Sequence, residues 1–107
     1  MLNIEAYGRI ASNIVVKKSK DTKHLYTNFL LASHDKKQTT FIRCVAFDGM
    51  ATLLHEYVSN GDRVILSGKL ISDDYNGSKY TFKIQVEKFE FIETKSEHEK
   101  NAIKHKV

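Results

Sequence analysis

Two phenylalanines flank an arginine at alternate positions of residues 39–47, TTFIRCVAF. Successive side chains of a strand point to opposite faces, so Phe41, Arg43 and Phe47 would share one face. Aromatic rings beside a cation are typical of surfaces on which nucleotide bases stack, with roughly 1–3 kcal/mol for each base. An arginine there pairs with phosphate or stacks on a base itself. The alternative is that both rings are core residues, packed against a helix or a partner subunit.

Basic side chains are concentrated in the first part of the chain. Residues 1–43 hold eight basic and three acidic residues, residues 44–107 hold nine and ten, and the formal net charge is +4. Clusters at 17–23 and 35–37 would attract polyanions; the alternative is that they are solvated loops that aid solubility. On charge alone, the candidate phosphate contacts are Lys17, Lys18, Lys20, Lys36, Lys37, Lys69 and Lys79.

The sequence carries no signature of catalysis. It lacks a glycine-rich phosphate loop, a nucleophile elbow and paired carboxylates at a recognisable spacing, so we expect no enzyme activity. Asp73 and Asp74 are adjacent, and adjacent residues of a strand point to opposite faces, which argues against a metal site. The five histidines are scattered. We therefore expect no metal and no cofactor.

Composition also indicates the compartment. A lone Cys44 cannot form an internal disulfide, which fits a reducing, cytoplasmic setting. The sequence has no run of about twenty apolar residues, and its start, MLNIEAYGRI, does not resemble a secretory signal. We expect a cytoplasmic, nucleoid-associated protein with no contact to a membrane.

Alternation of apolar and polar residues predicts a chain of strands with one helix. Helical spacing of Leu53, Leu54, Tyr57 and Val58 predicts a helix at about residues 50–59. The strands are predicted at 2–10 (continued by 13–18), 24–33, 39–47, 61–71 and 79–93.

Local signals mark the ends of these elements. Asp48 is a candidate N-cap or near-cap for the helix, and Asn60-Gly61 would close it through a left-handed turn. Gly68, inside a strand, indicates a bend or a close backbone approach. Asn76-Gly77 predicts a hairpin between the last two strands.

Three strands, a helix and two strands follow the order of an all-β OB-fold. This fold is a five-stranded Greek-key barrel with one helix between strands 3 and 4, and barrel closure lets a short chain bury a core. An SH3-like barrel or an open α+β sheet is the structural alternative. In a barrel, the expected inner residues include Phe29, Leu31, Ile42, Cys44, Ile65 and Ile84. Alternation assigns the two faces of a strand only relative to each other, so an exchange of faces stays open for some of them.

Several stretches, in order, resemble the bacterial-type single-stranded DNA-binding protein (SSB) family. LNIEAYGRI is similar to the family's first strand and NFLLAS to its second. TTFIRCVAF resembles its third strand, with an aromatic residue on each side of a basic or polar one. LLHEYVSNGDRVILSGKL resembles its helix, turn and fourth strand. The resemblance covers residues 2–93.

This resemblance implies sequence-tolerant binding and protection of single-stranded DNA in replication, recombination or repair. Phe41, Phe47 and Tyr75 fall at base-stacking aromatic positions, and Arg43 falls at a DNA-contacting position. The family also implies a homo-oligomer, typically a tetramer of dimers that pair through their first strands, although the sequence leaves a dimer open.

Three features depart from the family pattern. Asp73 and Asp74 precede Tyr75 where relatives commonly carry basic residues, and two carboxylates there would repel phosphate. The loop at residues 34–40 is short and has no match for an aromatic found in some relatives. The chain ends in KSEHEKNAIKHKV rather than in the long, acidic tail that recruits replication or recombination proteins. Such a short form fits a phage, plasmid or other mobile-element protein, or an auxiliary paralogue.

The expected organisation is therefore a DNA-binding domain at 1–93 and a short extension at 94–107, flexible or helical and dispensable for DNA binding. Two other functions stay open at this point. One is a primosomal, PriB-like replication-restart adaptor, which also binds single strands. The other is an OB-fold module that binds a protein through the face of Phe41 and Phe47.

Overall fold

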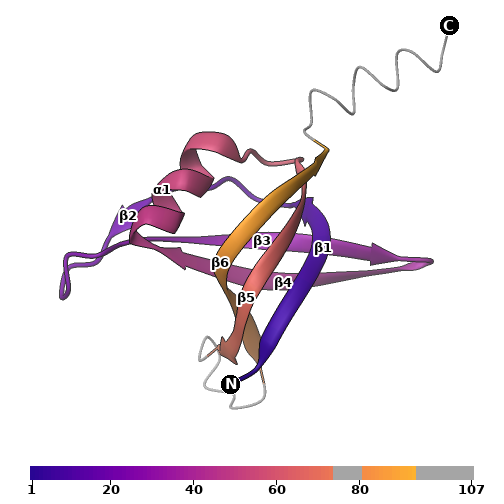
Figure 1. Ribbon diagram of the computed structural model, residues 1–107, viewed down its shortest axis with the longest axis horizontal. Helices are drawn as coiled ribbons and strands as arrows, with labels where there is room; N and C mark the ends of the chain where they lie inside the picture. Colours follow the sequence, from indigo (N-terminus) through magenta and orange to yellow (C-terminus); the bar gives the residue numbers. More distant parts are fainter. Residues whose placement is uncertain (74–80, 94–107) are drawn as a thin grey trace, which may run out of the picture.

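The computed structural model describes residues 1–73 and 81–93 of the chain. Six strands and one helix follow one another (Figure 1). They are β1 (Asn3–Ile10), β2 (Lys17–Lys18), β3 (Leu25–Asp35), β4 (Gln38–Phe47), α1 (Asp48–Tyr57), β5 (Arg63–Ser72) and β6 (Phe82–Glu93).

Five of the strands close into a barrel. Their order is β1-β5-β6-β4-β3, and β3 returns to pair with the end of β1 at Arg9 and Ile10. The β4–β6 pair is parallel and the other neighbours are antiparallel. The short β2 lies outside the ring on the edge of β3, so α1 falls between the third and fourth barrel strands. The predicted five-stranded barrel with one helix is confirmed.

The core is built from the inward face of each barrel strand and is closed at one end by α1. Of the expected inner residues, Phe29, Leu31, Cys44 and Ile84 are buried, while Ile42 is partly buried at the margin. The prediction for Ile65 was wrong, because β5 turns its neighbours on either side inward instead. The buried side chains contributed by β5 and α1 are Val64, Leu66, Ala51 and Leu54.

Cys44 lies in the middle of this core. It is fully buried, and burial raises the pKa of its thiol to about 12. The thiol therefore stays protonated at neutral pH and packs as a small apolar group.

The predicted continuation of the first strand through residues 13–18 was mostly wrong. Only Lys17 and Lys18 form a ladder with β3. The preceding segment is held to β3 by two other bonds instead. The Ala11 N–H donates to the Leu30 carbonyl at 2.8 Å, and the Leu30 N–H donates to the Ser12 hydroxyl at 2.9 Å.

The helix begins and ends two residues earlier than predicted. It follows β4 directly, with Phe47 at the N-cap and Asp48 next to it as the first helical residue. No side chain bonds to the cap, so the N-cap prediction for Asp48 was wrong. Gly61 has the expected left-handed conformation, with φ of 100°, but it lies beyond an extended Val58 that already ends the helix.

The predicted Asn76-Gly77 hairpin lies outside the described residues. In the described part of the chain, no helix has the length and apolar character needed to cross a membrane.

Gly68 permits a close backbone approach between two barrel strands, as its position in a strand predicted. A Cβ atom at Gly68 would overlap the backbone carbonyl oxygen of Gln85 on β6. The β5–β6 register shifts between Ser67 and Gly68. This bulge lets the two strands bend together around the barrel.

We expect Gly68→Ala to lower the free energy of unfolding by about 3 kcal/mol, at the upper end of the range for overpacking, because the obstacle is backbone. The matched control is Gly49→Ala in α1, whose new methyl group would meet no atom within 4 Å. This control should be neutral or stabilise by about 0.5 kcal/mol, since alanine favours helix. Urea unfolding measures both variants, and equal stabilities would contradict the close approach at Gly68.

Candidate nucleic-acid interface

The β3–β4 hairpin positions the aromatic side chains that the sequence singled out. Its register pairs Tyr26 with Phe47, Leu30 with Arg43, and Ala32 with Phe41. Residues paired across antiparallel strands share a face. We call the outward face of this hairpin the platform; its side chains are those of Tyr26, Asn28, Leu30, Ala32, Phe41, Arg43, Val45 and Phe47.

The two phenylalanines of the platform are exposed. Phe41 is 60% exposed and Phe47 is 43% exposed, whereas Val45 between Arg43 and Phe47 is 3% exposed. In the described chain neither ring belongs to the core. The alternation in β4 therefore places Cys44 and Ala46 inside and leaves two rings outside, available to a flat ligand.

The hairpin is long and its turn is short. Ten residue pairs join β3 and β4, and only Lys36 and Lys37 form the turn. Its tip extends past the barrel (Figure 1). Lys36 has a φ of 54°, in the left-handed region. The hairpin therefore carries two exposed lysines at its tip, beyond Phe41.

A second cationic cluster lies at the opposite end of the platform. A groove of about 760 Å³ is lined by Tyr26, Phe47 and three lysines. Lys17 pairs directly with Tyr26 in the β2–β3 ladder. Aromatic surface and positive charge thus meet in one groove, whose basic residues are Lys17, Lys18 and Lys20.

Asp48 fixes the wall of this groove. It has a φ of 48°, and its carboxylate accepts a bond of 3.2 Å from the Leu25 N–H. The His24 imidazole lies 3.2 Å from the same carboxylate. Because Asp48 follows Phe47 directly, these contacts join the end of β4 to the start of β3 and hold the ring of Phe47 beside the lysines.

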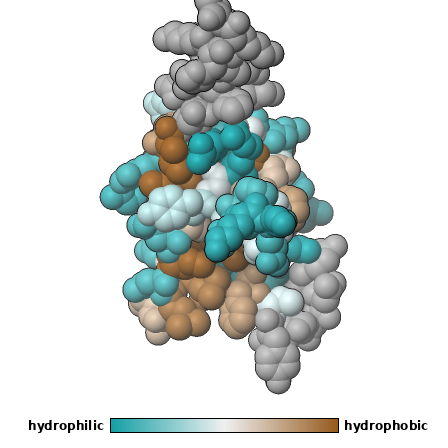
Figure 2. Space-filling view, turned by 90° about the vertical axis from the view of Figure 1, so that its right-hand side faces the viewer, coloured by the Kyte–Doolittle hydropathy of each residue, from teal (hydrophilic) through white to brown (hydrophobic). Residues whose placement is uncertain are grey.

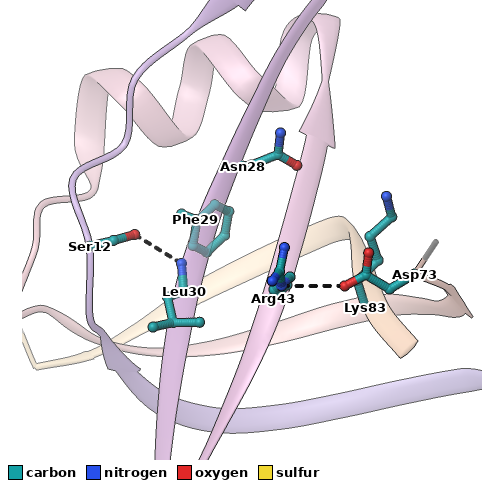
Figure 3. A pocket seen from close by; sticks show the side chains of 7 residues that line it. All are labelled: Ser12, Asn28, Phe29, Leu30, Arg43, Asp73 and Lys83. Carbon is teal, nitrogen blue, oxygen red and sulfur yellow. Dashed lines mark hydrogen bonds and ion pairs between the residues drawn. The ribbon is translucent and has the colours of Figure 1, made fainter. Parts of the chain in front are cut away.

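Arg43 lies near the centre of the platform, in a pocket of about 600 Å³ (Figure 3). Its Nε is 3.4 Å from Oδ2 of Asp73, which follows β5 directly. On the parallel neighbour β6, Lys83 is the register partner of Arg43. The remaining lining residues are Ser12, Asn28, Phe29 and Leu30.

The structure brings most of the predicted site residues to one side of the barrel. Phe41, Arg43 and Phe47 form the platform, with lysine clusters at its two ends. Lys69 lies farther away on β5, where its partner Gln85 is in turn the partner of Val45. Tyr75 and Lys79 lie outside the described residues. The DNA-contacting role of each residue stays a prediction.

Sequence reasoning missed Tyr26, Asn28 and Lys83. The signal for all three was present in the alternation, which had already turned Phe29 and Ile84 inward and hence their neighbours outward. The sequence pattern did not give the register, because alternation within one strand does not indicate which residues pair across two strands.

Comparison with known proteins agrees with this geometry. Residues 1–92 match the model of the single-strand binding protein family. A single-stranded DNA-binding protein of Onion yellows phytoplasma (strain OY-M) is 31% identical over 74 residues, which cover 65% of this chain and 71% of that protein.

Solved structures show the same fold. The second single-stranded DNA-binding protein of Mycobacterium smegmatis superposes with a TM-score of 0.71 at 16% identity, covering 85% of this chain and 88% of the other. The single-stranded DNA-binding domain of a Synechococcus protein gives a TM-score of 0.70 at 12% identity, with 83% and 93% covered.

The barrel is thus an OB-fold, the fold of the solved structures on which it superposes. The chain belongs to the single-strand binding protein family, whose members are non-enzymatic DNA-binding proteins.

Proposed function

We propose that this protein binds and protects single-stranded DNA with little sequence preference, using the platform. The observation that carries the proposal is the row of exposed rings on one hairpin face, Phe41 and Phe47 with Tyr26 beside the latter, between two lysine clusters. Bases stack on the rings and the lysines contact phosphates. Replication, recombination or repair are the processes in which such binding is needed.

Base stacking accounts for tolerance of sequence. Every base has a flat π-face, so a ring contributes roughly 1–3 kcal/mol whichever base lies on it. Phosphate contacts add an attraction that is likewise independent of sequence and that falls as salt rises. Neither contribution requires a hydrogen bond to a particular base edge, so the two together give affinity without selectivity.

The direct test of this function is a comparison of oligo-dT with a duplex of the same length, by fluorescence anisotropy of a labelled strand. We expect the single strand to bind at least a hundred-fold more tightly at moderate salt, because paired bases cannot leave the duplex to stack on the platform. Equal affinities would contradict stacking as the basis of binding.

Substitutions should separate stacking from charge. We expect Phe41→Ala and Phe47→Ala each to cost roughly 1–3 kcal/mol of oligo-dT binding at every salt concentration. Lys17→Ala should instead flatten the log–log salt dependence by about 0.7, the share of one phosphate on a single strand. Anisotropy titrations across a salt series measure both effects.

The control for these variants is thermal stability. Phe41→Ala and Phe47→Ala should unfold near the parent temperature, whereas Phe29→Ala should lose about 3–5 kcal/mol, because Phe29 is only 5% exposed. Platform variants that lose stability like Phe29→Ala while the folded fraction binds DNA normally would show that the rings serve the fold.

Assembly into a homo-oligomer, a tetramer formed from dimers, is part of the proposal. Along β1, residues Asn3–Arg9 pair with β5, and in the described residues no strand pairs with the other edge of β1 before Arg9. Apolar side chains also gather at the end of the barrel where the chain begins (Figure 2). Met1 and Leu2, which precede β1, are 92% and 58% exposed. An open edge beside exposed apolar surface supports pairing of two copies.

We expect light scattering on the purified protein to give four times the mass of one chain. Glu5→Pro, on the open edge of β1, should lower that mass, because proline obstructs strand pairing at an edge. A monomeric mass for the unsubstituted protein would contradict the proposed assembly.

A further inference from the structure

Asp73 places a negative charge against the central cation of the platform. Its side chain is 10% exposed and lies 3.4 Å from Nε of Arg43, whose own side chain is 44% exposed. The two residues are thirty positions apart in the chain and meet in the pocket that also holds Lys83 (Figure 3). A carboxylate is unexpected at the centre of a surface proposed to bind a polyanion.

The backbone of Asp73 is firmly held. The Asp73 N–H donates to the Thr81 carbonyl at 2.8 Å, and the Thr81 hydroxyl donates to the Asp73 carbonyl at 2.5 Å. These bonds join the end of β5 to the residue that precedes β6. Separating a largely buried charge from its partner is strongly unfavourable, so the pair should persist when DNA arrives.

We propose that Asp73 is a positioning residue that cancels the charge of Arg43 and makes Arg43 a base-stacking group, leaving the phosphate contact in this pocket to Lys83. The inference rests on the proposed function and says which part of the nucleotide each side chain meets. It assigns a base to Arg43 and a phosphate to Lys83, although these two cations are neighbours across β4 and β6.

Electrostatics supports this division. A phosphate near Arg43 is attracted by the guanidinium and repelled by the carboxylate at a similar distance, so the two Coulomb energies largely cancel. Lys83 differs, because among the described residues no carboxylate lies within ion-pair distance of its ammonium group. Lys83 therefore keeps more of its attraction for phosphate than Arg43 does, although Asp73 lines the same pocket.

Geometry supports stacking by Arg43. Partners that bond to a guanidinium lie in its plane, so a paired arginine still presents a flat face to a base. Arginine planes stack on unpaired bases in this way. The pocket of about 600 Å³ has room for one base, and the Asn28 amide at its wall offers both a donor and an acceptor to any base edge.

The test measures the salt dependence of oligo-dT binding for four variants of the full chain. Lys83→Ala should flatten the log–log slope by about 0.7, as the loss of one phosphate contact predicts. Arg43→Lys keeps a cation beside Asp73 but loses the flat guanidinium, so it should weaken binding by the same factor at every salt concentration and leave the slope unchanged. Asp73→Asn should steepen the slope by about 0.7, because this carboxylate then no longer offsets the attraction of Arg43 for phosphate. Adding Arg43→Ala to Asp73→Asn should return the slope to the parent value.

Two outcomes would overturn the inference. One is an Arg43→Lys protein that binds oligo-dT as tightly as the parent, and the other is a folded Asp73→Asn protein with the parent slope. Thermal unfolding establishes whether Asp73→Asn folds, and Arg43→Lys tests the stacking role without it. If the unsubstituted protein did not bind oligo-dT at all, the proposed function itself would fail, which is a distinguishable result.

Discussion

The two-residue period of one strand is the constraint on which both the core and the site depend. In β4, Cys44 and Ala46 fill the barrel while Phe41, Arg43 and Phe47 stand on its outer surface. A shift of one residue in register would bury the arginine and expose the thiol. The core thus enforces the position of the rings, because the apolar residues between them cannot face water without loss of the barrel's packing.

Positive charges and aromatic rings are distributed differently along the platform. Lysines lie at both ends of the hairpin face, in the groove beside Phe47 and at the tip beyond Phe41, whereas the centre holds the Arg43–Asp73 pair. A strand of DNA lying along the platform would meet lysines at both ends and, at the centre, a charge-compensated arginine with a flat face beside Lys83. This arrangement favours phosphates at the two ends and at Lys83, and bases between them.

Much of the fold could be predicted because its strands are separated by clear turns and alternate strongly. The same alternation exposed Phe41, Arg43 and Phe47 as one face. It failed at Ile65 because Val64, Ile65 and Leu66 are all apolar. Without a polar residue among them, the pattern does not indicate which side chains face the core. It also failed at residues 13–16, where an apolar segment packs on the barrel without a ladder of its own.

Contacts between distant segments could not be predicted from pattern at all. Asp48 has the residue type of a helix cap, yet its carboxylate bonds to the start of β3, more than twenty positions earlier. Asp73 was noticed only as a charge that repels phosphate, because nothing in the sequence indicates that it meets Arg43. Both contacts depend on closure of the barrel, which brings together segments with no local relation.

The most direct test of the proposed DNA-binding mode is a crystal structure of the protein with oligo-dT. We expect the strand to follow the outward face of β3 and β4, with bases stacked on Phe41 and Phe47 and a base over the guanidinium of Arg43. A strand bound to the outer face of β1 and β5, with the rings of the platform uncovered, would contradict it.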